Sequence, residues 1–186
     1  FQKGSERLPC MGSLQPPEGR ARGGCLGKIP APLDNELRTL ERGRAKWKAF
    51  LLSDIFHMVN TKSITQSDIV PNSGNTPYIT ASASNNGVMT TIACHHSWLE
   101  KGNCIMIGGK TLTFTYQEKD FCSNDSHNIA LYLKDERYAT RIHYLFFIAA
   151  LRAALRHRYS WGNSISMQRI KHESIYLPMK SNHIDF

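Results

Sequence analysis

One long apolar segment restricts the fold of this chain more than any other feature of its sequence. From about Asp135 to Arg156 the apolar residues recur at helical spacing. They cover two neighbouring sides of the helix, with Ile142, Leu145, Phe146, Ala149 and Ala153 on one side and Tyr144, Phe147, Ile148, Leu151 and Leu155 on the other. A helix that is apolar nearly all round is normally buried. The sequence therefore predicts one core helix over 135–156.

The segments before this helix are short and have the composition of β-strands. We expect strands at 77–80, 88–93, 103–107 and 111–116, with turns at 72–75, 85–87 and 108–109, and a final strand region at 165–178. Within 111–116, Leu112, Phe114 and Tyr116 alternate with threonines, which is the period of a half-buried strand. Together these elements predict the α+β class, with short, mostly antiparallel strands packed around one buried helix.

The composition changes near residue 45, and this change suggests two regions. Residues 1–45 are rich in Gly and Pro, so we interpret them as a tail or linker that has room for a short helix from Asp34 to Arg42. Residues 46–186 are expected to form a single domain. The apolar cluster from Trp47 to Phe56 is expected to anchor its first element.

The charge of the chain favours a polyanionic partner. The formal net charge is +8 and the sequence pI is about 9.4, and lysine and arginine near phosphates release condensed counterions. The five cysteines include no Cys-x-x-Cys pair, which favours a reducing compartment. The longest apolar run, Tyr144 to Leu151, is too short to cross a bilayer. The sequence thus predicts a cytoplasmic protein without a membrane partner.

No catalytic or metal-binding pattern stands out. The candidate zinc ligands are Cys94, His95, His96, Cys104, Cys122 and His127. They lack the close cysteine pairs of structural zinc sites, so buried free cysteines and surface histidines explain them more simply. Neighbours such as Cys94 and His95 point to opposite faces of a strand, and Gly108–Thr111 lacks the upstream glycine of a phosphate-binding loop. We therefore expect no catalytic residues, no metal and no cofactor.

Polar and basic residues gather at the predicted turns, where they suit nucleic-acid binding. Base edges are contacted by Arg, Lys, Asn, Gln, Ser and Thr, and phosphates by Arg and Lys. The expected DNA-binding residues are Lys62, Ser84, Asn85, Asn86, Lys110, Thr111, Arg158, Ser160, Asn163 and Arg169. Each of them is equally explained as an ordinary polar turn residue, so only the collective pattern favours DNA. Tyr159 and Trp161 are expected to be packing residues.

Several segments also occur in a familiar order and spacing. They are Trp47…Phe50-Leu51-Leu52-Ser53-Asp54-Ile55-Phe56, Thr76–Ser82 leading into Asn85–Val88, Ile105–Gly109, Thr113–Gln117, Phe121–Asn128, Tyr159–Gly162 and Ile175–Pro178. In these segments, residues 47–186 resemble a target-recognition domain of the Type I restriction-modification specificity (S) subunit family, which includes related S subunits of Type II systems. Residues 1–45 lie outside the resemblance.

The resemblance implies a non-catalytic module that reads part of a site in double-stranded DNA. In that family two such domains are generally separated by long helices, modification (methyltransferase) subunits bring S-adenosylmethionine and methyl transfer, and restriction subunits cleave. This chain has one such domain, so the resemblance leaves open a homodimer, a truncated product, or a degenerate or regulatory half-subunit, and leaves open whether modification and restriction subunits bind it.

Three other functions also stay open from the residues alone. They are general nucleic-acid binding without sequence specificity, binding of RNA or single-stranded DNA through exposed aromatics, and a small enzyme that uses Cys94 or Cys122.

Overall fold

The computed structural model describes residues 46–160, 162–180 and 183–184, and the strands of this part form three small sheets. Sheet A has the order β1-β9-β10, with β1 Lys46–Leu51, β9 Ser174–Lys180 and β10 His183–Ile184. Sheet B has the order β2-β8-β5-β6, with β2 Phe56–Asn60, β8 Ile129–Leu133, β5 Cys104–Gly108 and β6 Thr113–Gln117. Sheet C has the order β4-β3-β7, with β4 Val88–Ile92, β3 Thr76–Ile79 and β7 Cys122–Ser123.

The helices of the described part are mostly short. The α-helices are α2 Leu52–Ile55, α3 Arg141–Leu155 and α4 Met167–Ile170, and the 3-10 helices are η1 Gln66–Asp68, η2 Ser84–Gly87, η3 His96–Trp98 and η4 Glu136–Tyr138. All strand pairs are antiparallel except β3 with β7. The predicted α+β class with mostly antiparallel strands is confirmed. The possible helix from Asp34 to Arg42 and Trp161 lie outside the described residues, and the division at residue 45 stays a prediction.

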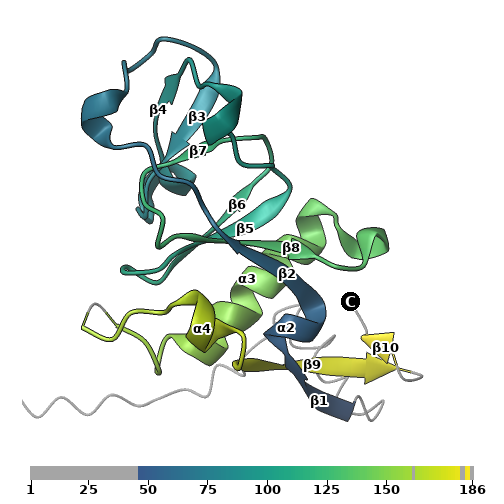
Figure 1. Ribbon diagram of the computed structural model, residues 1–186. Helices are drawn as coiled ribbons and strands as arrows, with labels where there is room; N and C mark the ends of the chain where they lie inside the picture. The colour runs from purple at the N-terminus through teal and green to yellow at the C-terminus, as the bar shows by residue number, and fades with distance from the viewer. Residues whose placement is uncertain (1–45, 161, 181–182, 185–186) are drawn as a thin grey trace, which may run out of the picture. The chain divides into compact units, whose positions relative to one another are not determined.

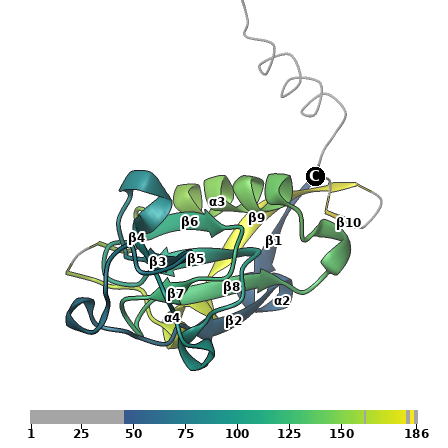
Figure 2. The same ribbon diagram turned by 90° about the horizontal axis from the view of Figure 1, so that it is seen from above.

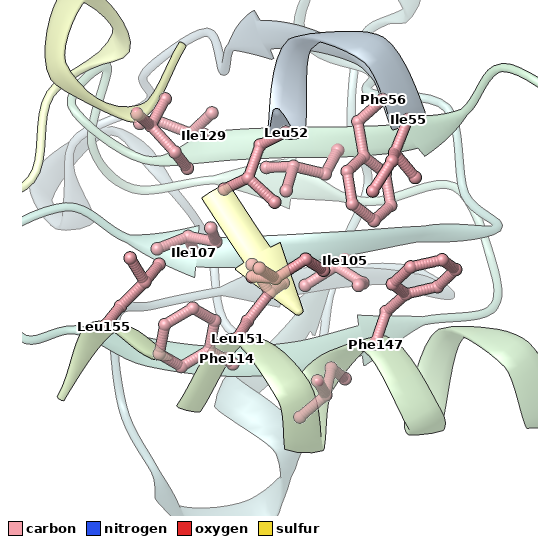
Figure 3. Packing of buried hydrophobic residues seen from close by; sticks show 14 of the residues in the cluster. Leu52, Ile55, Phe56, Ile105, Ile107, Phe114, Ile129, Phe147, Leu151 and Leu155 are labelled. Carbon is pink, nitrogen blue, oxygen red and sulfur yellow. The ribbon is translucent and has the colours of Figure 1, made fainter. Parts of the chain in front are cut away.

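Sheet B is the centre of the core because both of its faces are covered (Figure 1). Ile105 and Ile107 of β5 belong to the cluster that includes α2 and α3, and Figure 3 shows them facing Phe147 and Leu151. The alternate residue Met106 packs with Ile79 of sheet C on the other face. A strand buried on both faces needs a continuous apolar run, which explains the sequence Cys-Ile-Met-Ile of β5.

The long helix is shorter and more exposed than the sequence predicts. It begins at Arg141, because residues 136–138 form the separate 3-10 helix η4. The side chain of Asp135 caps η4 by accepting a hydrogen bond from the backbone N–H of Arg137. Its side chains at Ile142 and Leu145 are 74% and 47% exposed. The predicted burial all round was wrong because α3 lies on the outside of sheet B and packs with one side only, against β5, β6 and β9 (Figure 2).

The exposed side of α3 borders a shallow apolar groove. Its volume is about 450 Å³, and it is lined by Trp47, Phe146, Ala149, Ala150, Ala153, Ala154 and Tyr176.

No helix in the described part of the chain is long and apolar enough to cross a membrane.

The predicted strand at 111–116 also differs from the structure. It begins at Thr113, because Leu112 has a φ of 54° and completes a turn. The face with Thr115 and Gln117 is buried rather than exposed, since η2 covers it. The Gln117 amide Nε2 donates to the carbonyl of Asn86 (3.0 Å) and to Thr115 Oγ1 (2.9 Å), so this buried polar face is hydrogen-bonded.

Pairing between distant segments accounts for the elements that the sequence does not reveal. The residues 47–56, expected as one anchoring cluster, are divided into β1, α2 and the start of β2. β1 pairs with β9 from Lys46↔Met179 to Leu51↔Ser174, and β2 pairs with β8. The expected final strand region instead begins with α4 and becomes a strand only at Ser174.

Two of the cysteines that were predicted to be free are not free. Cys94 and Cys122 form a disulfide, with a Cα–Cα distance of 6.9 Å. The expectation was wrong because β3 pairs with β4 on one side and with β7 on the other, which brings residues 28 positions apart together. Cys104 is free and buried, as expected.

Candidate nucleic-acid interface

The turn at residues 84–86 presents two asparagines in the left-handed backbone conformation. Asn85 and Asn86 have φ values of 46° and 51°, and asparagine tolerates this region better than most residues do. The amide Nδ2 of Asn85 donates to the carbonyl of Val88 (2.9 Å), and that of Asn86 to the carbonyl of Tyr116 (2.7 Å). The exposed asparagines of η2 are therefore fixed against β4 and β6.

The turn between β5 and β6 lies next to the segment that leads into η2. Thr111 Oγ1 donates to the carbonyl of Ala81 (2.9 Å), and Thr111 also pairs with Thr113 Oγ1 (3.0 Å). Lys110 is 55% exposed, and its Nζ lies 2.8 Å from Asp125 Oδ2. The structure thus brings Ser84–Asn86 and Lys110–Thr111, two of the predicted groups, onto neighbouring turns.

The predicted residues after α3 form a second cluster. The backbone N–H and C=O groups of Ser160 and Asn163 bond to each other, and Asn163 Nδ2 donates to the carbonyl of Arg158 (2.7 Å). Arg169 Nη1 donates to Asn163 Oδ1 (2.8 Å), while its guanidinium lies 4.5 Å from the centre of the Tyr159 ring. Tyr159 is buried, as expected of a packing residue.

Arg158 of this second cluster is anchored by an acidic residue. Its Nη1 pairs with Glu173, which also accepts the hydroxyl of Tyr159 on Oε1 (2.5 Å). Burial, followed by the bond to this carboxylate, raises the pKa of Tyr159. Glu173 therefore holds the base of a loop that exposes Arg158 and Arg169.

One backbone hydrogen bond joins the two clusters. The N–H of Ile165 donates to the carbonyl of Gly109 (3.0 Å), so the loop after α3 lies against the turn that carries Lys110. Figure 2 shows η2 and the C-terminal end of α3 at the same end of β6. Nine of the ten predicted residues thus belong to one connected set of loops.

Lys62, the tenth predicted residue, stands apart from this set. Its backbone N–H donates to Glu100 Oε1 (2.7 Å), and its Nζ donates to the carbonyl of Leu99 (3.1 Å). These bonds direct its side chain toward the segment before β5 rather than toward Lys110.

The structure adds two residues that the sequence did not assign to this surface. Asp125 Oδ1 accepts the backbone N–H of His127 (2.9 Å) and lies 2.8 Å from His127 Nδ1, while Oδ2 holds Lys110. Partial burial acts to raise the pKa of Asp125, but the bonds from Lys110 and His127 outweigh it and lower the pKa to about 2. The polar run Asn124-Asp125-Ser126-His127-Asn128 between apolar strands is the sequence signal that could have revealed them.

The candidate zinc ligands do not come together as one group in the described part of the chain. Within the described ranges, no three His, Cys, Asp or Glu side chains are grouped closely enough to hold a metal ion. His95 and His96 contact each other and are exposed. Burial raises the pKa of the Cys104 thiol to about 12, and the sulfurs of Cys94 and Cys122 are bonded to each other. None of these three sulfurs is therefore a thiolate nucleophile in this state of the protein.

Comparison with known proteins identifies the same kind of domain. Residues 44–185 match the family described as "Type I restriction modification DNA specificity domain". Over 143 residues, 76% of this chain, the sequence is 31% identical to a Heyndrickxia coagulans protein named "Type II restriction enzyme BgcI specificity subunit S.BcgI".

Solved structures show a similar fold. The chain is similar to the S subunit of a Type I restriction-modification system from M. genitalium (TM-score 0.54, 14% identity, 75% of this chain and 36% of that one). It is also similar to the HsdS subunit of Thermoanaerobacter tengcongensis (TM-score 0.52, 14% identity, 71% of this chain and 33% of that one). The matched part spans 41% of the Heyndrickxia protein. This chain thus corresponds to less than half of each relative.

Proposed function

Because the chain belongs to the Type I restriction modification DNA specificity domain family, we propose that it recognises a short sequence in double-stranded DNA. In this proposal the chain binds without chemistry and selects the site for partner subunits of a restriction-modification system.

The observation that carries the proposal is the connection between the loops. The bond from Thr111 to Ala81 and the bond from Ile165 to Gly109 join η2, the Lys110 turn and the loop after α3 into one surface. Loops fixed on a rigid sheet can hold side chains in register with base edges of the major groove. The exposed groups on this surface are amides, hydroxyls and cations, which are the groups that contact bases and phosphates.

The residues have different roles in this mechanism. Arg158 and Arg169 would hold phosphates, since both are exposed arginines of the second cluster. Asn85, Asn86, Lys110 and Thr111 would contact base edges. A good bidentate base contact discriminates against the wrong base by about 1–3 kcal/mol, so a few such contacts suffice for a half-site of three or four base pairs.

The partners and the cellular place follow from the same proposal. Modification subunits would bind S-adenosylmethionine and transfer the methyl group, restriction subunits would cleave, and the assembly would work in the cytoplasm. A homodimer of this chain would supply the second half-site that a single domain lacks.

Selection from a randomised duplex pool tests the proposal, at about 50 mM and about 200 mM salt. The expected result is a short enriched motif that persists at the higher salt, and a Lys110→Ala variant that loses part of it. Lys119→Ala is the matched control, because Lys119 is an exposed lysine outside the connected loops. Weak binding that salt abolishes, with no enriched motif, would instead favour a general nucleic-acid-binding surface.

A further inference from the structure

His127 lies between the Lys110 turn of the proposed DNA-binding surface and the C-terminal end of β2. A Cβ atom at Gly109 would collide with the backbone oxygen of His127, so the Lys110 turn passes directly beside this residue. On the other side, Asn60 Nδ2 donates to the carbonyl of Ser126 (3.0 Å) and Thr61 Oγ1 to the carbonyl of Asp125 (2.8 Å). The backbone around His127 is therefore held from two directions.

A buried polar network supports this segment from below. Asn128 Nδ2 donates to Ser123 Oγ (3.0 Å), and Thr61 Oγ1 lies 2.9 Å from the same oxygen. Thr61, Ser123 and Asn128 are all buried. Networks of satisfied buried hydrogen bonds fix a single local conformation, so the position of His127 is set by the fold and not by its own side chain.

The contact with Asp125 orients the imidazole ring. Nδ1 of His127 lies 2.8 Å from Asp125 Oδ1. An ionised carboxylate only accepts hydrogen bonds, so in the neutral form of the ring Nδ1 carries the proton and Nε2 is the acceptor. The side chain is 68% exposed, which leaves Nε2 accessible from solvent.

We propose that His127 reads an exocyclic amino group of adenine or cytosine in the major groove, next to the base that Lys110 contacts; this rests on the function proposed above. In its neutral form the ring offers only an acceptor at Nε2, while phosphate oxygens, guanine O6 and N7, and thymine O4 are acceptors themselves. The amino groups of adenine and cytosine are the donors left in that groove.

Lys110 and His127 are complementary in this arrangement, and Asp125 is the residue that positions both. The Lys110 ammonium only donates and therefore matches the acceptors of guanine, while His127 accepts from an amino group. Because one carboxylate holds both side chains, they project from the surface as a pair with fixed spacing.

The test compares the motifs selected by wild type, His127→Ala and His57→Ala from a randomised duplex pool. His57 is an exposed histidine on β2 and serves as the matched control. Wild type and the His57 variant are expected to enrich the same motif with one position restricted to adenine or cytosine. The His127 variant should lose the preference at that position alone, with roughly tenfold weaker binding of the wild-type site.

Deleting the amino group from the DNA distinguishes base reading from a structural role. Purine replaces adenine, or 2-pyrimidinone replaces cytosine, at the restricted position of the selected duplex. Wild type should bind this duplex about tenfold more weakly than the intact one, whereas His127→Ala should bind both equally. In Asp125→Asn the difference between the two duplexes should shrink, because the ring is no longer oriented by a carboxylate.

Two results would overturn the inference. If wild type selects a motif that His127→Ala reproduces in full, DNA recognition stands and the role of His127 is wrong. If wild type selects no motif, the proposed function fails and the inference fails with it. Thermal melting of each variant, compared with wild type, verifies that a lost preference does not come from unfolding.

Discussion

Lys110 Nζ lies 2.8 Å from Asp125 Oδ2, so a cation of the proposed DNA-binding surface is already paired with an anion before DNA arrives. The carboxylate is the more buried member, at 24% exposure against 55% for the lysine. The ammonium has three N–H donors, so Lys110 can contact a base while this pair stays in place, and the neighbouring carboxylate weakens its non-specific attraction to phosphates.

The depressed pKa of Asp125 makes stability depend on acid pH. Its pKa is about 2 in the folded chain against an ordinary value of 3.8, so between these values the folded state binds fewer protons than the unfolded state. The stabilisation is present above pH 3.8 and is lost as pH falls toward 2. Urea unfolding of wild type and Asp125→Asn should differ by about 1–2 kcal/mol at pH 7 and converge near pH 2. A difference independent of pH would contradict the ion pairing.

Reduction of the Cys94–Cys122 disulfide should destabilise the domain. A cross-link between residues 28 positions apart lowers the entropy of the unfolded chain, which stabilises the folded state by about 3–4 kcal/mol in the chain-entropy account. Unfolding with and without dithiothreitol, and of Cys94→Ser, should show a loss of this order. Peptide mapping by mass spectrometry must find the Cys94–Cys122 pair in the oxidised protein. Equal stability of the oxidised and reduced forms would show that sheet C does not need the bond.

Two leucines of α3 test which side of the helix belongs to the core. Leu151 is fully buried in the main cluster, whereas Leu145 is 47% exposed. Leu151→Ala should lower the free energy of unfolding by about 2–5 kcal/mol because it leaves a cavity. Leu145→Ala should lower it by no more than about 1 kcal/mol, as measured by chemical denaturation. Comparable losses at both positions would mean that the exposed side of α3 is packed.

Arg169 is expected to order the loop after α3. Arg169→Ala removes two hydrogen bonds, to Asn163 and Ser164, and the contact with the Tyr159 ring. The variant should lower the free energy of unfolding by about 1–2 kcal/mol. It should also make the slope of the logarithm of the DNA-binding constant against the logarithm of salt concentration shallower by about one. Arg156→Ala is the control for charge, since Arg156 is an exposed arginine whose side chain has one described hydrogen bond, to its neighbour His157. An identical effect of both variants would reduce the role of Arg169 to its charge.

The sequence predicted those parts of the fold whose cause is local. Continuous apolar runs such as Ile105–Ile107 and turn residues such as Asn85 and Asn86 carry their own conformational preference, and the structure places them as expected. Burial of α3 on one side only depends on what packs against it, and no pattern within 135–156 contains that information. The pairing of β1 with β9 and of β2 with β8 depends on segments far apart in the chain, so it could not be predicted either.

The sequence predicted which residues belong to the candidate surface but not which residues they pair with. The polar composition of the turns indicated Lys110, Arg158 and Arg169. Their acidic partners Asp125 and Glu173 come from other segments, and only the folded chain brings them within hydrogen-bond distance. The same holds for His127, which appeared in the sequence only as a candidate metal ligand.

The pairing of β1 with β9 has a further consequence for how such a domain can be joined to other proteins. Because Lys46 of β1 is opposite Met179 of β9, two positions near the two ends of the described domain are neighbours, which for antiparallel partners are about 5 Å apart. A host loop could therefore accept the whole segment between them without its own ends having to separate. Exchanging one such cassette for another would replace the recognition loops while the geometry of the junction stays the same.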